Sequence, residues 1–319
     1  MPTPRVALAL GTGGARGYAH IGVLSALAER GYRVVALAGA GMGAVVGGLH
    51  AAGALDDYTA WARRLSQSDV LGYLDAALEG PGALRAEKLL APVFELIGDS
   101  RIEALPLHYT AVAADLLTGS EIWLQEGPLA SALQAAIATP GVITPAMLNG
   151  RLLVDGGILD PVPVAATASI HSDLVVAVCL TGDRWPGATA PTRASADRQP
   201  IDAWLERLRS AAGRVTDRDA VEALVARVRH TVADLPAHTE PQLTGLPEQL
   251  APMDVMNLSL AAMQSLLTRH RLAGHLPDIL VTVPRDACRA ADFHRAGELI
   301  DLGRRLAAEA LDGYEGDRR

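Results

Sequence analysis

This chain of 319 residues has few aromatic residues, few cysteines and no excess of positive charge. Phe, Trp and Tyr make up 4% of the residues while hydrophobic residues make up 50%, so the core must be built mainly from Ala, Val, Leu and Ile. The two cysteines, Cys179 and Cys288, form neither a disulfide framework nor a zinc-binding spacing, which indicates buried thiols in a reducing compartment. Lys and Arg number 28 against 36 Asp and Glu, and a net charge of −8 without a basic block argues against nucleic acid as a partner.

Long apolar runs are also missing, because no uninterrupted apolar stretch reaches the length of a transmembrane helix. The apolar residues 5–10 run into a glycine loop and not into a signal-peptide cleavage site, so we expect them to form the first strand. We therefore expect a cytoplasmic protein, either free or peripheral at the membrane. The chain length suits one large domain, or one domain with a subsidiary cap, and allows a sizeable core.

The apolar pattern alternates between strands and helices from the beginning of the chain. Residues 5–10 and 32–38 are apolar runs, and each leads through a glycine-rich turn into a helical pattern, at 17–30 and 44–52. A β-α-β-α beginning of this kind predicts an α/β fold with a mostly parallel sheet and helices on both faces. Further strands are expected at 107–114, 121–125, 151–154, 173–180 and 278–283, and further helices within 55–100 and at 128–138, 201–232, 246–272 and 291–312.

The domain organisation predicted from the sequence is a single domain over 1–319. Its core would consist of 1–180 and 276–319, joined through a linker at 182–200 and a helical segment at 201–272. The linker is rich in Pro, Ala, Gly and Arg, which is typical of an exposed connection. The sequence leaves open whether the helices of 55–100 or 201–272 form a lid.

The first motif that could carry chemistry is GTGGARG, from Gly11 to Gly17, between a strand and a helix. Successive backbone N–H groups at such a place form an anion site, for a phosphate or an oxyanion. Arg16 stands where a dinucleotide fingerprint requires glycine, and the Gly-Lys-Ser/Thr of a phosphate loop is absent, so nucleotide binding is disfavoured. A tight turn made for packing alone remains the alternative.

The second motif, Gly39-Ala40-Gly41-Met42-Gly43, has the frame of a nucleophile elbow, G-x-S-x-G, with glycine at its centre. An elbow holds its central residue in a strained conformation, which glycine tolerates better than other residues. We therefore expect Gly41 to adopt a backbone conformation unfavourable for most residues. An ordinary glycine-rich turn remains the alternative.

The third motif is Asp155-Gly156-Gly157, at the end of the strand expected at 151–154. An aspartate at this place can serve as a base toward a hydroxyl nucleophile, although a simple Asp-Gly turn would read the same way. The proline-punctuated loop 138–145 either lines a pocket or ends a helix. None of the nine histidines shows a metal-binding spacing, and His20 is expected to be structural.

Taken together in order and spacing, these segments resemble the patatin-like phospholipase family, in particular its bacterial members. The resemblance is carried by LALGTGGARGYAHIGVL, LAGAGMGAVVGGLHAAG, ATPGVITPAMLNGRLLVDGGILDPVPV and PDILVTVPRDACRAADFHRAGELIDLGRRLA, and it is weakest over 182–245. It implies a three-layer α/β/α sandwich and a lipid acyl hydrolase of the phospholipase A or esterase type. It also implies a Ser-Asp dyad, no cofactor or metal, and an acyl lipid or phospholipid as substrate.

The resemblance assigns roles to particular residues. It makes Asp155 the base, and Arg16 a residue that holds the glycine loop or a substrate headgroup. The remaining assignments are the oxyanion donors and loop residues Gly13, Gly14, Ala15, Gly17 and Met42, the elbow frame Gly39 and Gly43, and the glycines Gly156 and Gly157 that follow the base.

Two departures from the family pattern stand out: Thr12 replaces a glycine, and Gly41 occupies the position of the serine nucleophile. No neighbouring residue, Thr12 included, is expected to replace that serine, so the chain is expected to be inactive as written. We favour a variant of an active hydrolase, in which Gly41→Ser would restore turnover, because Asp155 and the loops are intact. The alternative is a natural pseudoenzyme that binds acyl lipid or a protein partner.

Overall fold

The computed structural model describes residues 3–79, 83–182 and 252–317. The linker predicted at 182–200, apart from Gly182, and the helix predicted at 201–232 lie outside the described residues. The same holds for the first residues of the helix predicted at 246–272.

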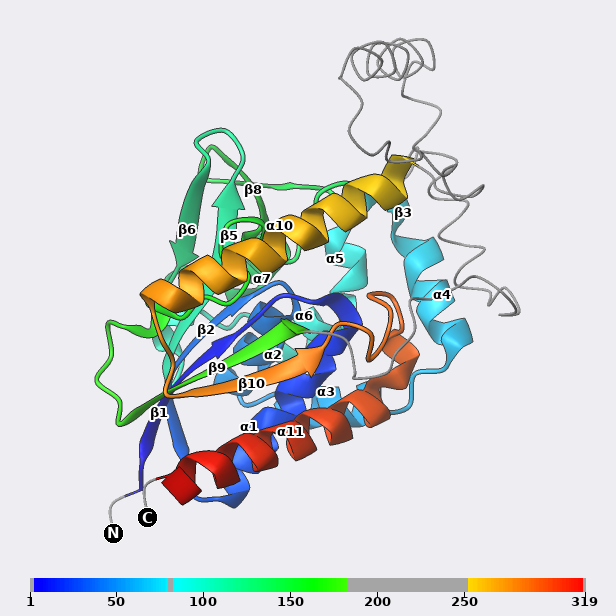
Figure 1. Cartoon of the computed structure of the whole chain (residues 1–319). Coiled ribbons are helices and arrows are strands. Elements are labelled where there is room, and N and C mark those ends of the chain that lie inside the picture. The colour runs from blue at the N-terminus through cyan, green and yellow to red at the C-terminus, as the bar shows by residue number, and fades with distance from the viewer. Residues whose placement is uncertain (1–2, 80–82, 183–251, 318–319) are drawn as a thin grey trace, which may run out of the picture.

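The centre of the molecule is an eight-stranded mixed sheet (Figure 1). Its strands run in the order β10-β9-β1-β2-β5-β8-β7, with β6 paired to β5. The pairs from β10 to β5 are parallel, whereas β6 and β8 each pair antiparallel with β5, and β7 pairs antiparallel with β8. The strands are β1 (Arg5–Leu10), β2 (Arg33–Ala40), β5 (His108–Asp115), β6 (Ser120–Leu124), β7 (Ala146–Leu148), β8 (Arg151–Asp155), β9 (Leu174–Gly182) and β10 (Ile279–Pro284).

Helices cover both faces of this sheet, which confirms the predicted three-layer α/β/α arrangement. Helix α10 crosses one face, while α1 and α11 pack together on the opposite one (Figure 1). The helices are α1 (Ala19–Glu29), α2 (Met42–Ala51), α3 (Leu55–Ala62), α4 (Gln67–Ala77), α5 (Ala86–Leu89), α6 (Ala91–Ile97), α7 (Leu129–Ala136), α10 (Pro252–Gly274) and α11 (Ala296–Asp317). No described helix is long and apolar enough to cross a membrane.

Three details differ from the sequence-based expectation. Within 55–100, where only helices were expected, β3 (Leu78–Glu79) and β4 (Ala83–Leu84) form a small antiparallel pair. Strand β7 was not predicted, because three residues before an Asn-Gly turn carry no readable periodicity. The helix expected at 17–30 begins as a 3₁₀ turn over Gly14–Tyr18, since the glycine loop leads straight into it.

The two faces of the sheet carry side chains of different size. Along β1, Leu8 and Leu10 belong to the large core under α1 and α11, whereas Ala9 lies in a small cluster on the other face. This alternation follows from the strand period of two residues. Both cysteines are buried and unpaired, as expected.

The register around β5 brings two strand ends together. Strand β6 pairs with Ala111 to Asp115 of β5, so β2 and β8 share the opposite edge. On that edge β2 ends with Ala40 opposite Val112, and β8 arrives from the other direction and ends with Asp155 opposite Ala113. The carboxyl ends of β2 and β8 therefore abut, which places Gly41 and Asp155 next to each other.

Candidate active site

Gly41 has the backbone of a nucleophile elbow. It links β2 directly to α2 with φ 54° and ψ −128°, a conformation that residues with a Cβ rarely adopt. The sequence-based prediction of a strained residue at this turn is confirmed. Because Gly41 precedes the first turn of α2, the N–H of Met42 belongs to the unbonded amino end of that helix.

Asp155 lies against this elbow. A Cβ built on Gly41 would be 2.9 Å from Oδ2 of Asp155, so a side chain at residue 41 would face the carboxylate. Oδ1 accepts a hydrogen bond of 2.8 Å from the N–H of Gly157. Burial raises the pKa of Asp155 to about 6, although the hydrogen bonds from Gly157 and Thr12 act in the opposite direction. A carboxyl group with such a pKa can accept a proton near neutral pH.

The hydroxyl group of Thr12 occupies the space between these two residues. Its Oγ1 donates a hydrogen bond of 2.9 Å to Oδ2 of Asp155, in a buried contact. A Cβ on Gly41 would collide with this oxygen. The sequence-based interpretation left Thr12 without a role, and the structure corrects it by placing the hydroxyl on the carboxylate. The sequence did offer one signal for this contact, because Thr12 is a hydroxyl residue at a place where the family motif has glycine.

The glycine loop offers free backbone donors beside Thr12. Among the described residues, the N–H groups of Gly13, Gly14 and Met42 have no hydrogen-bond acceptor, and these three residues are partly exposed. The expectation for Ala15 was wrong, because its N–H donates to the carbonyl of Ala290 at 2.8 Å. The available donors are suited to stabilise a negative charge next to Asp155.

Arg16 and His20 hold this loop in place. Arg16 donates through one guanidinium nitrogen to the carbonyls of Arg285, at 3.1 Å, and Cys288, at 3.3 Å, which ties the loop to the segment after β10. Of the two roles considered for Arg16, the geometry supports the structural one. Nε2 of His20 lies 2.8 Å from the carbonyl oxygen of Gly11, and burial lowers the pKa of His20 to about 4. His20 is thus a neutral donor in the interior, as its structural interpretation predicted.

Two motif glycines allow α2 to approach the loop closely. A Cβ on Gly17 would collide with the side chain of Met42, and a Cβ on Gly43 would collide with the carbonyl of Leu10. Their function is therefore close packing, which brings the amino end of α2 beside the donors of the loop.

Comparisons with known proteins show the family of this chain. The model of the patatin-like phospholipase family matches residues 8–168, the range that contains Thr12, Gly41 and Asp155. An uncharacterized NTE family protein of Mycobacterium tuberculosis is 46% identical, over 99% of this chain and 93% of its own length. This chain belongs to the patatin-like phospholipase family.

A more distant relative and a solved structure complete the comparison. A lysophospholipase of Emericella nidulans is 29% identical over 54% of this chain, which corresponds to 12% of that much longer protein. The crystal structure of VipD from Legionella pneumophila has a TM-score of 0.44 and 13% identity, over 98% of this chain and 67% of that one. That structural likeness is too weak to inform on function.

Helix α10 adds contacts to the patatin-like site that the sequence did not reveal. Gln264 donates to the carbonyl of Gly157 at 3.0 Å, and Arg271 pairs with Glu121 at 3.0 Å. Arg271 also lies 3.7 Å from Asp160, whose pKa is raised to about 7, mainly by burial and also by the nearby charge of Glu121. No local motif marks these residues, because they meet only through the packing of α10 on the sheet.

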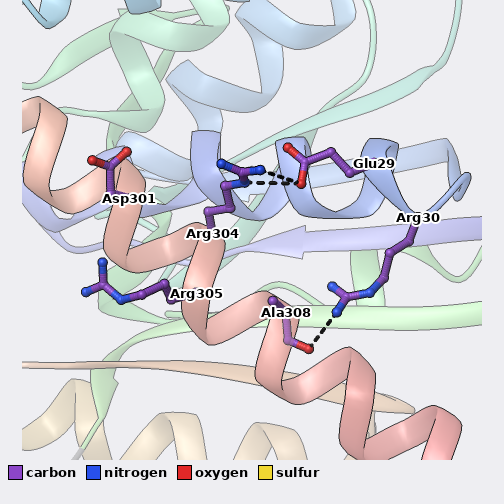
Figure 2. Close-up of a pocket in the computed structure, with 6 residues that line it drawn as sticks. All are labelled: Glu29, Arg30, Asp301, Arg304, Arg305 and Ala308. Carbon is purple, nitrogen blue, oxygen red and sulfur yellow. Dashed lines mark hydrogen bonds and ion pairs between the residues drawn. The ribbon is translucent and has the colours of Figure 1, made fainter.

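A separate hollow of about 340 Å³ lies between α1 and α11 (Figure 2). Arg304 pairs there with Glu29 at 3.0 Å, and Arg30 donates to the carbonyl of Ala308 at 3.2 Å. None of the site residues predicted from the sequence lines it. The hollow is a surface feature where charged side chains join two helices.

Proposed function

We propose that this protein is a lipid acyl hydrolase of the patatin type, acting on the acyl ester of a phospholipid or lysophospholipid. The observation that carries the proposal is the carboxylate of Asp155 beside the elbow at Gly41, next to free backbone donors. Membership of the patatin-like phospholipase family supports a lipid substrate. The lysophospholipase among the more distant relatives supports the same class of reaction.

In this proposal Asp155 is the base, and the N–H groups of Gly13, Gly14 and Met42 stabilise the oxyanion of the attacked ester. Gly41 contributes no nucleophile, so a serine dyad at this residue does not operate. Thr12 fills the space that a side chain at residue 41 would need. This favours Gly41 as an original part of the site over the idea of a serine removed from an active enzyme.

A second candidate function is the binding of acyl lipid without turnover. It is favoured by the hydrogen bonds that occupy both oxygens of Asp155, from Gly157 and Thr12. In such a pseudoenzyme the same contacts would serve only to keep the loops in shape.

The site would work at a membrane surface, with the protein peripheral and in the cytoplasm. Several apolar side chains on α10 support the contact with a membrane, because they are exposed to solvent: Val255, Met256, Leu258, Met263 and Leu266. Co-sedimentation with phosphatidylcholine vesicles would test it, and loss of binding on replacing Leu258 and Leu266 by serine is the expected result.

The experiment that tests the proposed activity measures release of fatty acid from lysophosphatidylcholine and phosphatidylcholine. We expect turnover by the unaltered protein and its loss in Asp155→Asn. Binding of a non-hydrolysable ether analogue is measured in parallel. Binding without any release of fatty acid would favour the pseudoenzyme, and neither binding nor release would refute both candidates.

A further inference from the structure

Thr12 presents a hydroxyl group on the base of the proposed site. It lies two residues after Leu10, the last residue of β1, and its Oγ1 donates to Oδ2 of Asp155 at 2.9 Å. Both side chains are nearly buried, with exposed fractions of 6% for Thr12 and 5% for Asp155. A hydroxyl held by a base within hydrogen-bond distance is the arrangement that activates serine or threonine as a nucleophile.

Two glycines create the space that Thr12 fills. A Cβ on Gly41 would collide with Oγ1 of Thr12, and a Cβ on Gly157 would collide with its Cγ2 methyl group. The hydroxyl therefore points to the place of a side chain at residue 41, while the methyl group lies on Gly157. Serine at residue 41 and threonine at residue 12 would compete for the same volume. The two departures from the family pattern are thus complementary, since one makes room for the other.

The backbone donors are equally well placed for a nucleophile on Thr12. In an elbow hydrolase, the N–H of the residue after the nucleophile helps to form the oxyanion hole. Gly13 follows Thr12, and Met42 follows Gly41, so both N–H groups adjoin the position of the hydroxyl. The partial exposure of Gly13, Gly14 and Met42 marks the side from which an ester would approach.

We infer that Thr12 is the nucleophile of this protein and forms a Thr-Asp pair with Asp155 in place of a serine at residue 41. The inference rests on the proposed function and names the group that performs it. Oγ1 of Thr12 bonds to the acyl carbon, and its proton passes to Asp155. The bond from the acyl carbon to the leaving alcohol breaks, and that alcohol takes the proton from Asp155.

Water then completes the reaction. It bonds to the acyl carbon of the threonyl ester and gives a proton to Asp155. The bond between the acyl carbon and Oγ1 breaks, and Thr12 takes the proton back, which releases the fatty acid. A β-branched nucleophile is more crowded than serine, so Thr12→Ser should react at least as fast as the unaltered protein.

Covalent labelling by a fluorophosphonate tests the assignment directly. The nucleophilic oxygen displaces fluoride from the phosphorus atom, and the phosphonyl group stays on the protein. Trypsin releases residues 6–16 as VALALGTGGAR, in which Thr12 is the sole hydroxyl residue, and residues 34–63 as a separate peptide that contains Gly41. We expect the label on the peptide 6–16, at Thr12.

Variants separate catalysis from packing. Thr12→Ser should keep both label and turnover, whereas Thr12→Ala and the equally bulky Thr12→Val should lower kcat/KM by more than about 100-fold and abolish the label. Thr59→Ala is the matched control, because the hydroxyl of Thr59 donates to the carbonyl of Leu55 within α3, and this variant should label and react normally. The double variant Thr12→Gly with Gly41→Ser should transfer the label to the peptide 34–63.

The outcomes distinguish this inference from the proposed function. Turnover that survives in Thr12→Val, or a label on another peptide, would overturn the role of Thr12 and leave the hydrolase standing. If the unaltered protein neither turns over nor labels while the double variant does both, the role of Thr12 is also overturned, because the unaltered protein would then lack only a nucleophile. If neither protein reacts or labels, both the inference and the hydrolase are refuted.

Discussion

Replacing Asp155 by asparagine is expected to make the protein more stable at neutral and alkaline pH, at the cost of its activity. The side chain is buried at the end of β8, where ionisation is opposed by loss of hydration. Asparagine has nearly the same shape and carries no charge. Its amide oxygen can still accept from Gly157, and its NH₂ group can donate to the hydroxyl oxygen of Thr12.

The size of the effect follows from the pKa of Asp155. In the folded protein it is raised from 3.8 to about 6, a difference of about 2.2 units, and each unit corresponds to about 1.36 kcal/mol. Because the folded state holds this proton more tightly, the contribution to stability is present below pH 3.8 and lost as the pH rises through about 6. The free energy of unfolding should thus lose about 3 kcal/mol by pH 8, with about half of the loss already reached at pH 5.

Urea unfolding of both proteins between about pH 5 and 8 measures this difference. The advantage of Asp155→Asn should increase with pH and level off above about pH 7. The raised pKa of Asp160 affects both proteins alike and cancels in the comparison.

Asp115→Asn is the matched control with the opposite sign. Burial acts to raise the pKa of Asp115, but hydrogen bonds from Leu117, Thr118 and Arg151 outweigh it, so the pKa lies below its ordinary value. This variant should be less stable than the unaltered protein at neutral pH. If Asp155→Asn brings no gain at pH 8, or the same gain at every pH, the carboxylate does not carry the desolvation cost on which its proposed role as a base depends.

Three further results are expected. The rate of ester hydrolysis should rise as Asp155 ionises through about pH 6, and a flat profile of kcat/KM between about pH 5 and 8 would exclude this carboxylate as the base. Gly41→Ala should lower the free energy of unfolding by about 1–3 kcal/mol through backbone strain, with more lost through the collision with Thr12, and an unchanged urea midpoint would contradict the elbow. Because burial lowers the pKa of His20 to about 4, neutral His20 should favour folding above pH 6.5, and this contribution to stability should be lost as the pH falls toward 4. In acid unfolding curves, His20→Gln should therefore lose less stability over this pH range than the unaltered protein.

Much of this fold can be derived from local sequence patterns. The runs around β1, β2, β9 and β10 are apolar and bounded by turns, and the glycine-rich segments after β1 and β2 indicate close approaches of backbone. The central residue of the elbow was recognisable because a strained turn needs glycine when the serine is absent. The aspartate was recognisable because it ends a strand and precedes two glycines.

Other features depend on which segments meet. The hydrogen bond between Thr12 and Asp155 joins residues 143 positions apart, and the N–H of Ala15 is withdrawn from the oxyanion donors because it donates to the carbonyl of the distant Ala290. The antiparallel entry of β8 decides that Asp155 abuts Gly41, and the pairing register that sets it is a property of the whole sheet. By itself the sequence determined the turns, the alternation of the strands and the glycine at the centre of the elbow, because these follow from the conformations and polarity of neighbouring residues. Only the tertiary structure decided that the hydroxyl of Thr12 lies on Asp155, because a close contact between distant segments leaves no periodic pattern in either of them.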